Sequence, residues 1–139
     1  MKRFEFVDIT TGDVAFIAYG STLEELFSNA ALAMFEIMVD TSKVEKIEKR
    51  YLECHGYDLE SLLVNWLNDL LIFVDSENMV FSDFEVDIDE NNFKLKAVCY
   101  GEKINKTKHE TRTAVKAATY HKIKIEKNSV WKAQVIVDI

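Results

Sequence analysis

The sequence predicts an α+β fold of two layers, in which two amphipathic helices pack against a mostly antiparallel or mixed sheet of six or seven strands. Three patterns lead to this prediction. Two long segments carry apolar residues at helical spacing, most other segments alternate apolar and polar residues, and short polar turns join neighbouring alternating segments. With 139 residues, of which 48 % are hydrophobic, the chain has enough apolar material for a single domain over residues 1–139.

The clearest helix is expected over residues 21–39, where Ser21 and Glu24 have the spacing of a capping box. A second helix is expected to begin after Asp58, a suitable N-cap. Each helix has a single apolar stripe, and one face of a sheet could cover both stripes. The stripe residues are Leu23, Leu26, Phe27, Ala30, Ala31, Met34, Phe35 and Met38 in the first helix, and Leu59, Leu62, Leu63, Trp66, Leu67, Leu70, Leu71 and Val74 in the second.

Alternation of apolar and polar residues predicts the strands. Over residues 80–90 the acidic side chains face one way and the apolar ones the other, and the pattern returns over residues 93–100 after the Asn91-Asn92 turn. These two segments are therefore expected to form a hairpin with one face in water. Residues 102–115 are the longest irregular stretch. The remaining strands are expected over residues 4–8, 13–19 and 44–55, and in a second hairpin over residues 119–126 and 129–139 that turns at Lys127-Asn128.

Composition and charge argue against stable nucleic-acid binding. Asp and Glu outnumber Lys and Arg by 24 to 17, which gives a formal charge of −7, whereas phosphate backbones are bound by clustered basic residues. An acidic protein can instead dock against a basic enzyme. No segment approaches the roughly 18 consecutive apolar residues of a membrane span, and the first residues lack the apolar region of a signal peptide, so we expect a cytoplasmic protein without membrane contact.

The last two residues bring carboxylates together. Asp138 is followed by Ile139, so the Asp138 side chain lies within a few ångströms of the terminal α-carboxylate. Carboxylates this close repel each other unless a cation lies between them, and oxygen donors suit Ca²⁺ or Mg²⁺. Asp13, which follows a turn-like segment and begins a strand, would complete the cluster if it faced Asp138 across a sheet. The structural alternatives are that Asp13 caps its own turn and that Asp138 is only solvated. Asp8 could replace Asp13 or end its own strand.

Signatures of catalysis are absent from the sequence. The three histidines, His55, His109 and His121, have no zinc-ligand spacing with Cys54 or Cys99, and the two cysteines are expected to be free thiols. The nucleophile elbow, the Walker motif and the dinucleotide glycine motif do not occur. An enzyme is therefore the weaker class.

Several segments resemble the archease family in order and over nearly the whole chain. The most specific are VKAATYH (residues 115–121) and the terminal WKAQVIVDI (residues 131–139), together with STLEELFSNAALAMFEIMVD (residues 21–40). The resemblance implies an α+β fold and a role as cofactor of the RtcB-type RNA ligase in tRNA splicing, where archeases promote guanylylation of the ligase and restore its turnover. It implies a protein partner and no active site in this chain.

The resemblance also implies a metal site made of Asp13, Asp138 and Ile139, with calcium as the first choice of divalent metal and magnesium or manganese as alternatives. The N-terminal motif of the family usually reads His-Thr-Ala-Asp, and its aspartate corresponds to Asp13. Counted back from Asp13, Thr10 stands at the histidine position in this sequence. Lys116 corresponds to a family lysine close to the acidic site, where it would neutralise carboxylates or touch the ligase. The structural alternative for Lys116 is a solvated residue at a strand edge.

The sequence therefore favours a non-enzymatic activator of the ligase. Two alternatives stay open: a general chaperone or modulator of RNA-modifying enzymes, which would need a large exposed apolar patch, and a small metal-dependent hydrolase. His121, whose strand parity is opposite to that of Lys116, could face the core, and its role stays open together with the oligomeric state.

Overall fold

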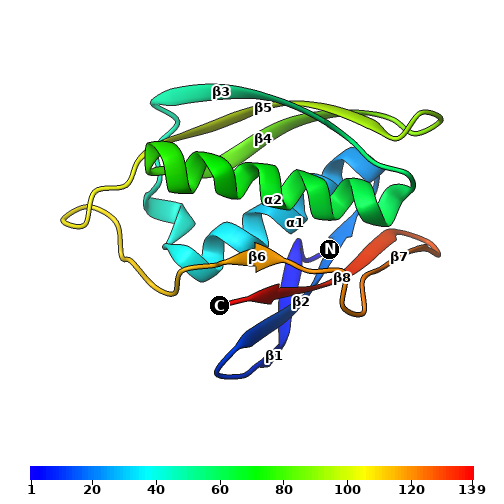
Figure 1. The fold of residues 1–139 in the computed structure, drawn as a ribbon, viewed down its shortest axis with the longest axis horizontal. Helices are drawn as coiled ribbons and strands as arrows, with labels where there is room; N and C mark the ends of the chain where they lie inside the picture. Colours follow the sequence, from blue (N-terminus) through cyan, green and yellow to red (C-terminus); the bar gives the residue numbers. More distant parts are fainter.

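The computed structural model describes all residues from 1 to 139. Two α-helices lie between two antiparallel sheets, so that the molecule has three layers in Figure 1. The elements in chain order are β1 (Phe4–Ile9), β2 (Asp13–Gly20), α1 (Leu23–Met38), a 3₁₀ turn η1 (Thr41–Lys43), β3 (Glu48–His55), α2 (Leu59–Glu77), β4 (Met79–Asp89), β5 (Lys94–Lys103), β6 (Ala117–Ala118), β7 (Lys124–Lys127) and β8 (Trp131–Asp138).

The α+β class with two helices and antiparallel strands is confirmed, and the strands divide into two sheets. One sheet has the order β1-β2-β8-β6, with β7 also pairing with β8, and the other has the order β3-β5-β4. The prediction of a single sheet underestimates how much of the surface of α1 is buried. Leu32, Ala33 and Ile37 lie outside its predicted stripe and are nevertheless buried, because α1 contacts β2 and β8 on one side and β4 on the other.

Helix α1 begins two residues later than predicted. Thr22 is the N-cap, and its hydroxyl accepts a hydrogen bond from the Glu25 backbone N–H at 3.1 Å. The Glu25 carboxylate accepts in turn from the Ser21 backbone N–H at 3.1 Å. The predicted cap at Ser21 with Glu24 is therefore wrong by one residue, since the reciprocal bonds use the next pair along the chain.

Helix α2 begins where predicted, with Asp58 as its N-cap. Its carboxylate accepts from the Ser61 backbone N–H at 2.7 Å, and the Ser61 hydroxyl accepts from the Asp58 N–H at 3.1 Å, which completes a capping box. The buried Trp66 indole donates to the Phe27 carbonyl at 3.0 Å and so ties the two helices together. Neither helix combines the length and apolar character needed to cross a bilayer.

The predicted hairpins are confirmed at β4–β5 and β7–β8. Residues 44–55 contain β3, which pairs with β5 along its length. Gly101 of β5 is required by packing, because a Cβ there would overlap the backbone of Val80. Cys54 and Cys99 are both free thiols.

The strand predicted over residues 119–126 is only partly correct. Pairing with β8 is split between β6, which ends at Ala118, and β7, which begins at Lys124. A turn separates them, with Lys122 in the left-handed region at φ 53° and a hydrogen bond from the Ile123 N–H to the Tyr120 carbonyl. His121 lies in this turn and is exposed, so the core-facing reading of this histidine is wrong.

Candidate metal centre

The ends of β2 and β8 bring the two predicted aspartates face to face. Asp13, the first residue of β2, is the direct cross-strand partner of Asp138, the last residue of β8. The Ile139 N–H donates to the Gly12 carbonyl at 2.9 Å. The ladder bond therefore falls one residue beyond the aspartates, which places them in a non-hydrogen-bonded pair, where side chains come closest. Both aspartates are exposed.

The Thr10 hydroxyl closes the turn that leads into Asp13. It accepts from the Asp13 backbone N–H at 3.0 Å and from the Gly12 N–H at 3.3 Å. The Thr10 N–H donates to the Asp13 carbonyl at 2.9 Å. The Thr10 hydroxyl, and not the Asp13 carboxylate, therefore caps this turn, and the predicted alternative for Asp13 is wrong. Its carboxylate has no hydrogen-bond partner within the chain.

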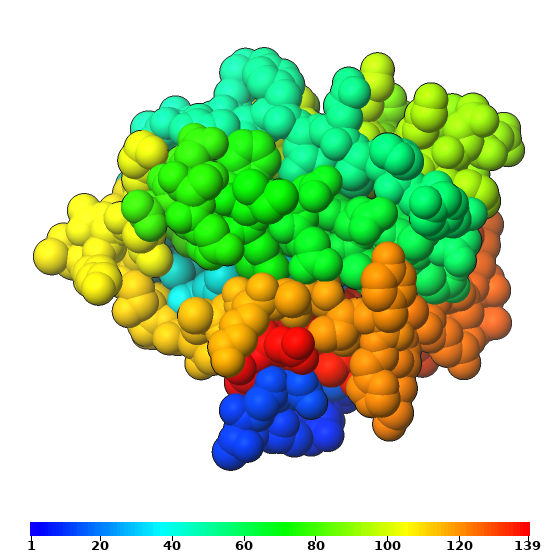
Figure 2. All heavy atoms as spheres, in the orientation of Figure 1, coloured from blue at the N-terminus to red at the C-terminus, as the bar shows by residue number.

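Lys116 reaches the same place through its backbone. Its N–H donates to the Asp138 carbonyl at 2.8 Å, and Ala117 pairs with Asp138 across β6 and β8. Strand β6 is held from the other side by Asn68 of α2, whose side chain bonds both the N–H and the carbonyl of Ala118 at 2.8 and 3.1 Å. In Figure 2 the red C-terminal atoms are exposed between the orange segment that contains β6 and the blue N-terminal hairpin.

Charge at this strand end is unbalanced. Neither Asp13 nor Asp138 takes part in an ion pair, and the exposed Lys116 ammonium has no carboxylate within ion-pairing distance. Like charges directly opposite each other destabilise a sheet. Asp8 pairs with Ala15 and therefore lies on the same face, one strand further out.

The donor set at this end suits a hard cation. Carboxylate oxygens are the ligands that Ca²⁺ and Mg²⁺ prefer, and Ca²⁺ takes about six to eight of them, water included. No place in the chain gathers three or more His, Cys, Asp or Glu side chains that could hold a metal ion. Asp13 and Asp138 are the two side-chain carboxylates that the register of β2 and β8 brings together at this strand end.

The thiols and histidines do not assemble a nucleophile. Burial raises the pKa of the Cys99 thiol to about 12. Burial, with a smaller contribution from the Asp69 charge, does the same for Cys54. Neither thiol is ionised near neutral pH, and the thiolate is the reactive form. His55, next to Cys54 in β3, is exposed.

A buried charge cluster, missed by the sequence reasoning, anchors the irregular segment that leads to Lys116. The Glu102 carboxylate is bonded by the Lys108 ammonium at 2.8 and 2.9 Å and by the Glu45 N–H at 2.7 Å. His109 Nε2 lies 3.1 Å from the same carboxylate but is not aligned for a hydrogen bond, while Nδ1 accepts from the Asn105 N–H at 2.8 Å. Burial alone would raise the pKa of Glu102, but these donors outweigh it and lower the pKa to about 2. No motif marks this cluster, because Glu102 belongs to a strand and its partners to loops.

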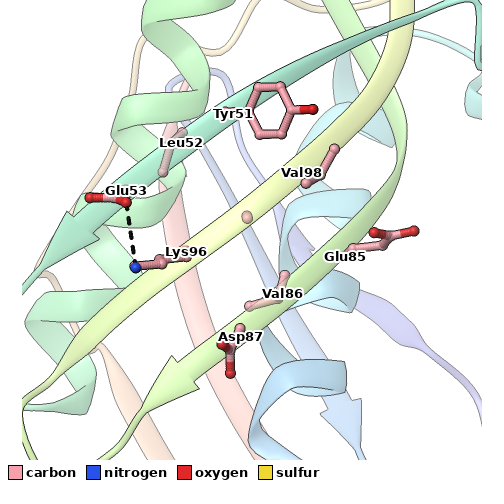
Figure 3. Close-up of a pocket in the computed structure, with 9 residues that line it drawn as sticks. Tyr51, Leu52, Glu53, Glu85, Val86, Asp87, Lys96 and Val98 are labelled. Atoms are coloured by element: carbon pink, nitrogen blue, oxygen red, sulfur yellow. Dashed lines mark ion pairs between the residues drawn. The ribbon is translucent and has the colours of Figure 1, made fainter.

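A shallow hollow on the outer face of β3, β5 and β4 is the other prominent surface feature (Figure 3). Charges of both signs line it, and Lys96 lies 3.8 Å from Glu53. Glu85 and Asp87 of β4 stand on the same face. This is the solvated polar face that the alternation over residues 80–90 predicts.

A helix pair between two antiparallel sheets, with oxygen donors gathered at one strand end, defines an α+β protein with a candidate carboxylate centre. A model of the archease protein family matches residues 4–139. The protein archease of Sulfurisphaera tokodaii is 51% identical over 140 residues and that of Pyrococcus abyssi 49% identical over 143 residues, each covering all of both chains. The solution structure of Methanobacterium thermoautotrophicum protein 1598 covers all of both chains with a TM-score of 0.84 and 48% identity. The chain belongs to the archease family.

Proposed function

We propose that this protein is a non-catalytic activator of an RtcB-type, GTP-dependent tRNA-splicing RNA ligase, which it helps to become guanylylated and to turn over. Family membership over residues 4–139 supports the choice of partner. The observation that carries the proposal is the pairing of Asp13 with Asp138 at an exposed strand end. Unpaired carboxylates on an acidic protein suit contact with the basic surface of an enzyme that handles RNA.

The proposed site holds a divalent cation, calcium first and magnesium or manganese as alternatives, between Asp13, Asp138 and the Ile139 α-carboxylate. The oxygen-only donor set and the absence of a cationic partner for either aspartate support this assignment. A bound cation would supply positive charge for the ligase's nucleotide phosphates. The exposed ammonium of Lys116 is free to contact the ligase beside it.

The test is ligase guanylylation under multiple-turnover conditions, with and without the protein. The wild-type chain should raise turnover, and Asp13→Ala and Asp138→Ala should abolish the increase. Glu90→Ala is the matched control, because Glu90 is an exposed carboxylate without an ion pair in the β4–β5 turn. Wild-type protein that leaves ligase turnover unchanged would reject the proposal.

The role of the terminal carboxylate can be tested separately. Adding one glycine after Ile139 moves this carboxylate by one residue and leaves Asp13 and Asp138 in place. The extended chain should bind calcium more weakly by calorimetry than the wild type does. Equal affinity would remove Ile139 from the ligand set and keep the aspartates.

The alternative of a general chaperone would need uncovered helix stripes, and a specific observation counts against it. The stripe residues of α1 are buried between the two sheets, and those of α2 are buried except for Leu59 and Val74, which pack partly buried against the core. Release of product from a nucleotide or phosphoester by the chain alone would contradict the non-catalytic part of the proposal. The cytoplasmic location stays a prediction.

A further inference from the structure

An apolar groove opens beside the strand end that carries the candidate centre. Its volume is about 240 Å³, and its apolar lining comes from Phe6, Ile9, Val14, Ile37 and Ile139. The groove has a simple structural cause. The cross-strand pairs of β1 and β2 place Phe6 and Ile9 on the same sheet face as Val14. Ile37, in the last turn of α1, closes the other side of the groove.

Two of the apolar side chains that line the groove are exposed to water. Phe6 is 38% exposed and Ile9 67% exposed. At about 240 Å³ the groove is smaller than the roughly 300–1,000 Å³ of small-molecule sites. A space of this size suits one or two bulky side chains of a protein partner, the usual form of an interface hot spot.

The charges around the groove indicate what should flank such a side chain. Arg112 at the rim is already balanced, because it donates to Glu110 at 2.6 Å and to Glu36 at 2.7 Å. The Asp13 and Asp138 carboxylates lie at the same strand end, on the opposite sheet face from Val14 of the groove, and neither takes part in an ion pair. Two unpaired carboxylates against the one unpaired ammonium of Lys116 make this strand end net negative, which is complementary to Lys or Arg.

Ile139 connects the groove with the candidate centre. Its side chain lines the groove, and its α-carboxylate belongs to the proposed ligand set, while Asp13 and Asp138 stand on the opposite face of the sheet from Val14 and Val137. A partner that grips this strand end would contact both faces at once.

We propose that the groove is the docking point for the ligase, which inserts a bulky apolar side chain flanked by Lys or Arg. This inference rests on the proposed function and adds to it the place and chemistry of the contact. The groove supplies affinity, and the carboxylates beside it supply the activating contact. The two surfaces are therefore expected to control different parameters of activation.

The experiment titrates the ligase with this protein and measures both the half-maximal concentration and the maximal rate of guanylylation. Ile9→Ser removes the apolar rim without disturbing the core, since Ile9 is 67% exposed. Ile47→Ser is the matched control, because Ile47 is 65% exposed and does not line the groove. Ile9→Ser should raise the half-maximal concentration roughly tenfold with the maximal rate kept, whereas Ile47→Ser should change neither. Asp138→Ala should lower the maximal rate.

Equal half-maximal concentrations for Ile9→Ser and the wild type would overturn the groove assignment and leave the proposed function standing. Calorimetric titration of the ligase separates the other failures. If the ligase binds without being activated, the proposed function is rejected; weaker binding of Ile9→Ser than of the wild type then supports the groove assignment, and equal binding overturns it. If the ligase does not bind, both are overturned. Affinity that does not fall as salt is raised would contradict the cationic flank. Self-association of the wild type that Ile9→Ser abolishes would assign the groove to a second copy of this chain and overturn the proposal.

Discussion

Asp13 and Asp138 lie directly opposite each other in the last cross-strand pair of β2 and β8, and neither carboxylate has a cationic partner. A like-charged pair in this position destabilises the sheet. A neutral replacement of either residue would relieve this repulsion. The substitution is therefore expected to stabilise the chain without metal and to destabilise the chain with a bound cation.

Without metal, Asp138→Asn should raise the melting temperature by about 1–3 °C, because it removes one of two repelling charges. With calcium in excess, the wild type should gain stability, by about 2.7 kcal/mol at 100 times the dissociation constant. The variant should gain little. Thermal unfolding in chelator and in calcium measures both effects.

Glu90→Gln controls for the loss of one negative charge. It should leave the response to calcium intact, because Glu90 lies in the turn between β4 and β5. A calcium response that is the same in Asp138→Asn and Glu90→Gln would show that these carboxylates hold no ion.

The Thr10 hydroxyl should be required for calcium affinity although it carries no charge. Thr10→Val keeps the shape of the side chain and removes the acceptor for the Asp13 and Gly12 N–H groups. The loss of these bonds should cost about 0.5–1.5 kcal/mol of stability. Calcium affinity should also fall, because the backbone of Asp13 is then less fixed. Thr11→Val is the neighbouring control, and identical calorimetric titrations for the two variants would refute the positioning role.

The sequence indicates that Asp13 begins a strand and that Asp138 ends one, and the structure pairs the two residues across β2 and β8. Their role as metal ligands stays a prediction that comes from the family resemblance. A register slip of one residue would have placed Asp13 and Asp138 on opposite faces. Their exact pairing depends on the turn closed by Thr10 and on the Ile139 N–H, which no sequence pattern reveals. Lys116 reaches the site through a two-residue strand that is too short to show alternation.

The three-layer arrangement escaped prediction for a different reason. The predicted stripe of α1 includes only the residues at strict helical spacing. Leu32 and Ile37 lie on another side of the helix and are also buried. A helix that is apolar around most of its circumference needs cover on both sides. The Glu102 cluster and the apolar groove likewise form from residues that are distant in the chain. In the cluster, for example, Lys108 pairs with both Glu45 and Glu102.

The cap of α1 can be checked at two adjacent hydroxyl residues. Thr22→Ala should destabilise the protein by about 1 kcal/mol, because it removes the acceptor for the Glu25 N–H. Ser21→Ala should have no measurable effect, since only the backbone of Ser21 takes part, as a donor to the Glu25 carboxylate. Denaturant unfolding of both variants decides the matter. A larger loss for Ser21→Ala would restore the cap predicted from the sequence.

The Glu102 carboxylate should make stability depend on pH in the acidic range. Burial would raise the pKa of this carboxyl, but the hydrogen bonds from the Lys108 ammonium and the Glu45 N–H outweigh it and lower the pKa from 4.5 to about 2. A depressed pKa in the folded state means that the carboxylate stabilises the protein above about pH 4.5, and that this contribution is lost as the pH falls towards 2.

Glu102→Gln should therefore cost about 1–3 kcal/mol at neutral pH, because it removes the charge that pairs with Lys108 and replaces one of the two acceptor oxygens with an NH₂ donor. The difference in unfolding free energy between wild type and variant should shrink as the pH falls below about 4.5, where protonation begins to remove the same charge from the wild type. Glu53 forms an exposed ion pair with Lys96 at 3.8 Å, so Glu53→Gln should not measurably change the free energy of unfolding at any pH. Urea unfolding from neutral pH into this acidic window tests the prediction, and a gap between wild type and Glu102→Gln that stays constant throughout would mean that the Glu102 charge does not hold this segment in place.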